Sequence, residues 1–106
     1  MRLTLEHEGK LYTYEIRKQV TTIGRDPKSD ISLPTSTISR FHAQCRREGD
    51  DCYVKDLGSR NGVWVNGARV QEARLRDGDQ IRLGKVTLRF GDKAGPAVPK
   101  GFELAD

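Results

Sequence analysis

Three polar clusters interrupt the apolar parts of this sequence, and they hold the residue types that could carry out chemistry. In chain order they are Gly24-Arg25, then Ser39-Arg40-Phe41-His42, then Ser59-Arg60-Asn61-Gly62. Each lies where an alternating apolar segment breaks into Gly, Ser, Asn and Arg, which is typical of strands that end in polar loops. If these loops meet at one end of a sheet structure, their guanidinium, hydroxyl and amide groups could bind a small dianion carried on a peptide.

A hydrolase is the first alternative, with Ser39 as nucleophile, His42 as base and Asp56 as the orienting carboxylate. Residues three apart on a strand point to opposite faces, so Ser39 and His42 would face each other only across a sharp bend. Nucleophile and base must lie within hydrogen-bond reach, and no G-x-S-x-G turn surrounds the serine. We therefore predict that the protein is not an enzyme and that His42 hydrogen-bonds to neighbouring loops and braces them.

Nucleotide, metal and nucleic-acid sites lack their sequence signatures. The chain has neither G-x-x-x-x-G-K-[ST] nor G-x-G-x-x-G. The six residues between Cys45 and Cys52 do not match the short C-x(2–4)-C spacing of zinc sites. The net charge of +4 favours acidic partners, but no basic stripe interleaved with aromatic residues indicates nucleic acid. We expect no cofactor, no metal and no nucleic-acid partner.

Length and composition favour one small domain. A chain of 106 residues can bury about 60–70% of its unfolded surface, which suffices for a single core. Apolar residues make up 35% and charged residues 32%, as in soluble globular domains. No apolar run approaches the ~20 residues of a membrane span, and no signal peptide is evident. We expect a cytoplasmic monomer with no membrane partner.

The cysteines leave two alternatives open. Thiols are expected to stay reduced in the cytoplasm. A hairpin over residues 46–51 could nevertheless place Cys45 and Cys52 opposite each other, which would allow a cross-strand disulfide.

Short alternating segments rich in β-branched residues predict about ten strands, separated by Gly, Asn, Asp and Pro turns. The predicted strands are Leu3–Leu5, Leu11–Val20, Val20–Ile23, Ile31–Leu33, Phe41–Arg47, Cys52–Leu57, Val63–Val65, Ala68–Val70, Gln80–Leu83 and Val86–Phe90. Val70–Leu75 is too short for a helix and is predicted to be a turn. Trp64 and Tyr53 are predicted to be core residues. This pattern indicates an antiparallel β-sandwich.

The composition changes at Gly91 to Gly, Ala, Pro and Lys, which can bury little surface. We predict a folded domain over residues 1–91 and a flexible tail or linker over residues 92–106.

The three clusters resemble the motifs of the forkhead-associated (FHA) domain family. The family pattern G-R, S-x-x-H and N-G occurs in order and at similar separations, and the resemblance covers about Leu3 to Phe90. It implies an all-β sandwich of about eleven strands, of the FHA and SMAD type, with binding loops at one end. It also implies a non-catalytic module of kinase signalling that binds phosphothreonine-containing proteins or peptides, such as kinase substrates or autophosphorylated kinases. A phospho-independent protein-interaction domain of the same fold is the alternative.

The resemblance also implies residue roles. Four residues are expected to contact the phosphate: Arg25, Ser39, Arg40 and Arg60. Asn61 is expected to hydrogen-bond to the peptide backbone beside the phosphothreonine. Four residues are expected to support the loops: Gly24, His42, Ser59 and Gly62.

Overall fold

The computed structural model describes residues 1–7 and 9–91 of the chain. These residues form eleven strands and no helix, and so no helix that could cross a membrane. The strands are β1 (Arg2–His7), β2 (Lys10–Glu15), β3 (Val20–Gly24), β4 (Ile31–Ser32), β5 (Ala43–Glu48), β6 (Asp51–Asp56), β7 (Val63–Val65), β8 (Ala68–Val70), β9 (Glu72–Leu75), β10 (Gln80–Leu83) and β11 (Val86–Gly91).

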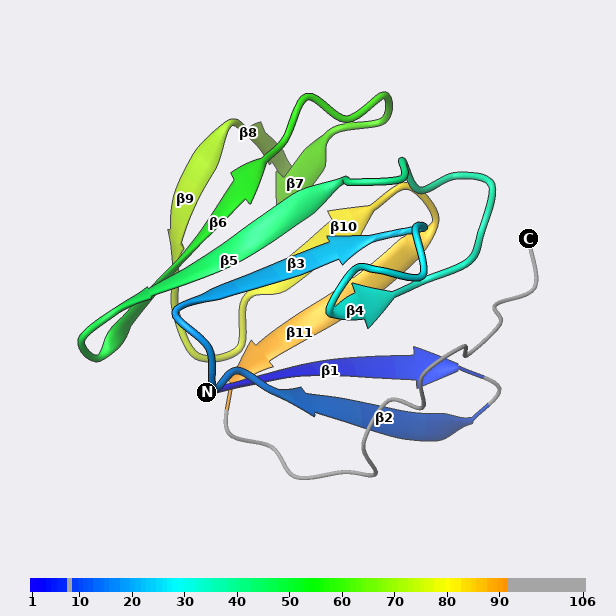
Figure 1. Cartoon of the computed structure of the whole chain (residues 1–106). Coiled ribbons are helices and arrows are strands. Elements are labelled where there is room, and N and C mark those ends of the chain that lie inside the picture. The colour runs from blue at the N-terminus through cyan, green and yellow to red at the C-terminus, as the bar shows by residue number, and fades with distance from the viewer. Residues whose placement is uncertain (8, 92–106) are drawn as a thin grey trace.

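The strands form two sheets that pack face to face. The six-stranded sheet has the order β2-β1-β11-β10-β7-β8, and the five-stranded sheet has the order β4-β3-β5-β6-β9. In Figure 1, β3 and β5 of the five-stranded sheet pass in front of β10 and β11. Among the described strands, only β3 and β4 pair in parallel. The predicted β-sandwich of about eleven strands is confirmed.

Alternation of apolar and polar residues builds the core between the sheets. In β11, Val86, Leu88 and Phe90 are buried while the residues between them are exposed. From the other sheet, Ile23 and Val54 are fully buried against the same core. Each such side chain contributes about 1.5–3 kcal/mol on burial. A one-residue slip would turn a whole apolar set outward, so the core fixes the strand register.

The two ends of the described domain lie side by side. Arg2 of β1 pairs with Gly91 of β11, and the backbone N–H of Ile16 donates to the carbonyl of Met1 at 2.9 Å. These residues lie at the opposite end of the sandwich from the turn between β10 and β11.

Two predicted elements are wrong: one predicted strand is too long, and one predicted turn contains a strand. The strand predicted over Leu11–Val20 stops at Glu15, because the chain then crosses to the other sheet and begins β3 at Val20. The predicted turn over Val70–Leu75 contains β9, which pairs with β6 and covers that edge. Sheet pairing overrides the weak local pattern of so short a segment.

The strand predicted over Phe41–Arg47 begins too early, and Phe41 does not share the core face with Ala43 and Cys45. The strand begins only at Ala43, and the Phe41 residue is 52% exposed in the loop before it.

The aromatic residues Trp64 and Tyr53 are also not core residues. Both are partly exposed on the outer faces of the sheets, where the guanidinium carbons of Arg82 and Arg46 lie 4.8 and 5.2 Å from their ring centroids. Val63 and Val54, their buried neighbours, point inward and so direct these rings outward.

Cys45 and Cys52 are buried free thiols in the structure. They are diagonal rather than direct neighbours, because Cys45 lies opposite Val54 and Cys52 lies opposite Arg47. A hydrogen bond with Cys52 and burial both raise the pKa of the Cys45 thiol well above its usual value.

We predict that Thr21→Val will raise the free energy of unfolding by about 1 kcal/mol, because the fully buried Thr21 hydroxyl has no hydrogen-bond partner among the described residues. The adjacent Thr22→Val is the control. Its hydroxyl donates to Asp30 Oδ2 at 3.1 Å and accepts from the Asp30 N–H at 3.0 Å, so this change should lower stability. Urea unfolding of the three proteins measures both effects, and destabilisation by Thr21→Val would contradict the prediction.

Candidate functional site

Three loops meet at one end of the sandwich: residues 25–30 after β3, residues 33–42 before β5, and residues 57–62 between β6 and β7 (Figure 1). The Arg25 N–H donates to the Ser39 carbonyl at 3.0 Å, and the Asp26 N–H donates to the Arg40 carbonyl at 3.1 Å. The Arg60 N–H donates to Ser39 Oγ at 3.1 Å. The loops that carry the four predicted phosphate-binding residues are therefore in direct contact.

Ser39 is the centre of this cluster. Its carbonyl accepts from Arg25, its hydroxyl oxygen accepts from the Arg60 N–H, and its own N–H donates to the imidazole of His42. A hydroxyl can accept and donate at once. The Arg60 contact therefore holds the Ser39 oxygen in place, and the hydroxyl keeps a proton that it can donate.

His42 joins two of the loops from inside the fold. It is fully buried, and its Nδ1 accepts the Ser39 N–H at 3.1 Å, so the ring proton is on Nε2. Nε2 donates to the Gly62 carbonyl at 2.8 Å. The sharp bend that would bring Ser39 and His42 together is present, because residues 39–42 form a turn and not a strand. Their contact nevertheless involves the serine backbone, and both ring nitrogens are already occupied.

The loop of residues 57–62 is held in a tight turn by its own side chains. Asp56 Oδ1 accepts the Ser59 N–H at 2.8 Å, and Ser59 Oγ accepts the Gly62 N–H at 3.0 Å. Gly62 has φ +82°, a left-handed conformation that favours glycine. Asp56 thus caps this loop and does not orient His42.

Gly24 allows the close crossing of two backbones. A Cβ atom at this position would lie 2.0 Å from the carbonyl oxygen of Arg40, so any side chain would force the two loops apart. This is a packing reason for glycine immediately before Arg25.

Asn61 is held from two sides. The side-chain Nδ2 of Asn61 donates to the Thr37 backbone carbonyl at 2.7 Å. The backbone carbonyl of Asn61 accepts from Trp64 Nε1 at 3.0 Å. Thr37 is held in turn, because its Oγ1 accepts the Lys85 N–H at 3.1 Å. The sequence predictions missed Thr37, Trp64 and Lys85 as parts of this network. These contacts join residues far apart in sequence, and no local pattern indicates them.

The arginines of the three loops lack acidic partners. In residues 1–7 and 9–91, no carboxylate forms an ion pair with Arg25, Arg40 or Arg60. Three uncompensated guanidinium groups at one end of a small domain create a positive potential, which favours an anionic ligand.

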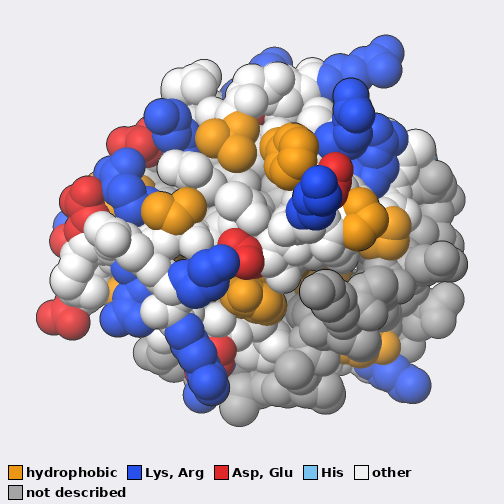
Figure 2. Space-filling model, in the orientation of Figure 1, with side chains coloured by type: hydrophobic (Ala, Val, Ile, Leu, Met, Phe, Trp, Pro, Cys, Tyr) orange, Lys and Arg blue, Asp and Glu red, His pale blue; other side chains and the backbone are white. Residues whose placement is uncertain are grey.

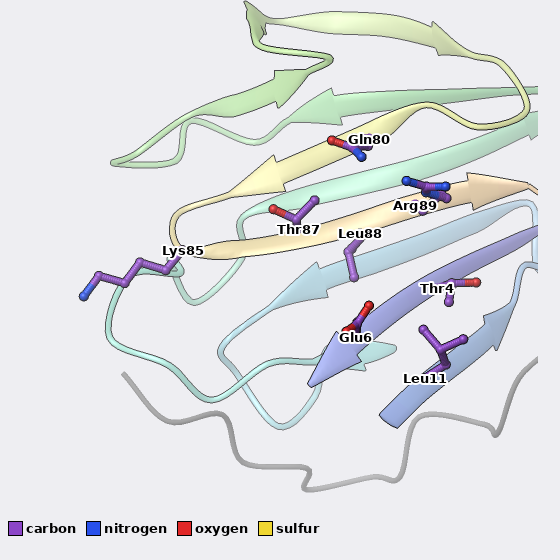
Figure 3. A pocket seen from close by; sticks show the side chains of 8 residues that line it. All are labelled: Thr4, Glu6, Leu11, Gln80, Lys85, Thr87, Leu88 and Arg89. Carbon is purple, nitrogen blue, oxygen red and sulfur yellow. The ribbon is translucent and has the colours of Figure 1, made fainter. Parts of the chain in front are cut away.

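A hollow of about 480 Å³ lies on the outer side of the six-stranded sheet and meets the network around Asn61 at Lys85 (Figure 3). Its lining residues are Thr4, Glu6, Leu11, Gln80, Lys85, Thr87, Leu88 and Arg89. None of the predicted phosphate-binding residues lines it. The hollow is therefore not the predicted phosphate site.

Comparison with known proteins identifies the family of this chain. A sequence model of the FHA domain matches residues 21–84, more than half of the chain. The chain belongs to the FHA domain family.

Some similar proteins are about twice as long as the matched region, and others consist of the FHA domain alone. Glycogen accumulation regulator GarA of Mycolicibacterium smegmatis is 47% identical over 66% of this chain and 44% of its own length. The oxoglutarate dehydrogenase inhibitor of Corynebacterium jeikeium is 45% identical over 69% of this chain and 51% of its own length. The chain thus spans about half the length of these curated relatives. An FHA domain studied for phosphothreonine-dependent interactions is 37% identical, with a TM-score of 0.79 over 89% of this chain and 99% of its own.

In this FHA domain, Asp30 braces the loop that follows Arg25. Its carboxylate accepts from Lys18 Nζ at 2.7 Å and from the Thr22 N–H at 2.9 Å. Partial burial alone would raise the pKa of Asp30, but the hydrogen bonds from Lys18 and Thr22 outweigh it and lower the pKa below its usual value.

We predict that Asp30→Asn will lower the free energy of unfolding at neutral pH by about 1 kcal/mol, because a carboxylate accepts stronger hydrogen bonds than an amide. The pKa of Asp30 is lower in the folded state than in the unfolded state. The stability that its carboxylate contributes is therefore complete above the unfolded-state pKa of about 4, and it is lost as the pH falls through the folded-state pKa. Urea unfolding between about pH 2 and pH 7 should show the two proteins converging in acid. A constant difference would contradict this.

Proposed function

We propose that this FHA domain binds phosphothreonine-containing polypeptides and catalyses no reaction on them. The observation that carries the proposal is the cluster around Ser39, whose three loops present the uncompensated arginines Arg25, Arg40 and Arg60. The phosphothreonine-dependent interactions of a similar solved FHA domain support it.

Arg25 and the Ser39 hydroxyl bind the phosphate oxygens, and Arg40 and Arg60 add charge beside them. A phosphate carries about −1.5 to −2 charge near neutral pH. Each hydrogen bond to a charged group contributes about 1.5–3 kcal/mol. After the costs of association, two or three such bonds and a backbone contact leave about −8 kcal/mol, which corresponds to micromolar binding. Most of this is lost without the phosphate, so binding is switched by a kinase.

Asn61 binds the peptide backbone beside the phosphothreonine. One Nδ2 hydrogen is used by the Thr37 carbonyl, which leaves the second Nδ2 hydrogen to donate to a peptide carbonyl and Oδ1 to accept a peptide N–H. The contact to Trp64 holds the Asn61 backbone before the ligand arrives. Less ordering is then needed on binding, which improves affinity.

The absence of catalysis in this proposal has a geometric basis. A serine nucleophile needs a base at its hydroxyl. Both nitrogens of His42 are instead bonded to backbone groups, and the Asp56 carboxylate accepts from Ser59.

The physiological partner is a phosphorylated kinase or kinase substrate, and because kinases use ATP the module acts in the cytoplasm. The binding unit comprises residues 1–91 and acts as a monomer. Residues 92–106, for which a flexible tail or linker is expected, lie outside the described part of the chain.

Replacing Arg25 by Ala should weaken binding of a phosphothreonine peptide by at least about 30-fold, because it removes about 2 kcal/mol or more of charge-assisted hydrogen bonding. Titration by fluorescence anisotropy measures the loss. Arg76→Ala is the matched control, since Arg76 follows β9 at the opposite end of the sandwich. The unphosphorylated peptide is titrated in parallel. Retained affinity in Arg25→Ala, or equal binding of the unphosphorylated peptide, would refute the proposal and favour a phospho-independent interaction domain.

Replacing Asn61 by Ala should weaken binding of the phosphothreonine peptide by about 10-fold, the effect of one lost hydrogen bond of about 1.5 kcal/mol. Binding of inorganic phosphate should change much less, because Asn61 contacts the peptide backbone. Calorimetry with the two ligands measures both affinities. Equal losses would show that Asn61 does not act on the backbone.

A further inference from the structure

A row of three side chains crosses the outer face of the six-stranded sheet next to the loop cluster. Trp64 on β7 lies directly opposite Arg82 on β10 and directly opposite Arg69 on β8. The guanidinium carbon of Arg82 lies 4.8 Å from the indole centroid, a cation–π arrangement. The Cβ atoms of cross-strand partners stand about 4.5–5.5 Å apart, so Arg69 and Arg82 project from the strands on either side of Trp64.

This row adjoins the loop of residues 57–62. Trp64 Nε1 donates to the Asn61 carbonyl at 3.0 Å. Arg69 lies against Gly62, because a Cβ atom placed on that glycine would be 2.6 Å from Arg69 Nε. The face that carries Arg69, Trp64 and Arg82 is therefore continuous with the loop that carries Arg60 and Asn61.

The positive charge of this row is not compensated. Within the described part of the chain, neither Arg69 nor Arg82 forms an ion pair. On the outer face of the five-stranded sheet, by contrast, Arg46 and Arg74 pair with Glu48 at 2.9 Å and Asp51 at 3.0 Å. Figure 2 shows that face, where acidic and basic side chains are interspersed. Arg69 and Arg82 thus differ from Arg46 and Arg74, which are paired with acids of the described residues.

We propose that Arg69 and Arg82 bind an acidic segment of the same polypeptide that carries the phosphothreonine. This inference rests on the proposed function and extends it from the phosphate to the neighbouring ligand sequence. The guanidinium fork binds carboxylates in two parallel hydrogen bonds. Arg82 is already stacked on Trp64, so less side-chain entropy is lost when it binds.

The dimensions of the sheet set the reach of this contact. Three adjacent strands at a spacing of about 4.8 Å span about 10 Å from β10 to β8, which an extended peptide crosses in about three residues. Since Trp64 contacts Asn61, which the proposed function places at the peptide backbone beside the phosphothreonine, the acidic residues are placed within about five positions of the phosphothreonine. Both charge contacts are at the surface, so their effect weakens with salt.

The test uses two phosphothreonine peptides, one with glutamates and one with alanines at the five positions on each side. The chain is compared with Arg69→Gln/Arg82→Gln and with the matched control Arg74→Gln/Arg76→Gln, which removes the same charge elsewhere. We expect wild type and control to bind the glutamate peptide about fivefold tighter than the alanine peptide at low salt, as two exposed charge contacts would produce. The Arg69→Gln/Arg82→Gln variant should lose this preference and bind the alanine peptide normally. Half-molar salt should abolish the preference in wild type and in the control variant.

Failure of this inference is distinguishable from failure of the proposed function. The acidic-segment site is overturned if wild type binds both phosphopeptides equally. It is also overturned if the control variant loses the preference as fully as the Arg69→Gln/Arg82→Gln variant does. In both cases phosphothreonine binding stands. If neither phosphopeptide binds better than its unphosphorylated form, both proposals are refuted. Oligothymidine is titrated as an additional probe. Binding of oligothymidine that is lost in the Arg69→Gln/Arg82→Gln variant, without any preference between the peptides, would overturn the proposal in favour of a nucleic-acid surface.

Discussion

A single buried imidazole holds the candidate binding loops in register. His42 accepts the Ser39 N–H on one side and donates to the Gly62 carbonyl on the other. The imidazole is fully buried, so the bond to Gly62 lies out of contact with water and the bond from Ser39 is partly buried. Replacing the ring would leave two backbone groups without partners, at about 1–3 kcal/mol each. The position of Ser39, and through it that of Arg25 and Arg60, depends on this one side chain.

The network around His42 organises the site before any ligand binds. Gly24 lets the loop of residues 33–42 cross closely over the end of β3, and Thr37 ties that loop to the turn before β11. The backbone groups are thus satisfied within the protein, whereas the loop guanidinium groups remain available. Affinity then depends little on loop ordering, and ligand charge becomes the main determinant.

The sequence predicts those parts of the molecule that depend on local chemistry. Strand alternation identifies β11 and the hairpin strands, and the polar clusters mark the loops that carry Arg25, Ser39 and Asn61. It fails where tertiary pairing decides the outcome. The segment of β9 has no strong pattern of its own and becomes a strand only because β6 offers an edge. Residue type alone predicts that Trp64 is a core residue. Val63 beside it is buried, however, so Trp64 points to the outer face of the sheet.

The antiparallel pairing of Arg2 with Gly91 brings the two ends of the described fold together, at the pole of the sandwich opposite the three loops. Polypeptide fused at either point would emerge on the side remote from Ser39. The domain can therefore be inserted into, or fused to, other proteins without covering the three loops.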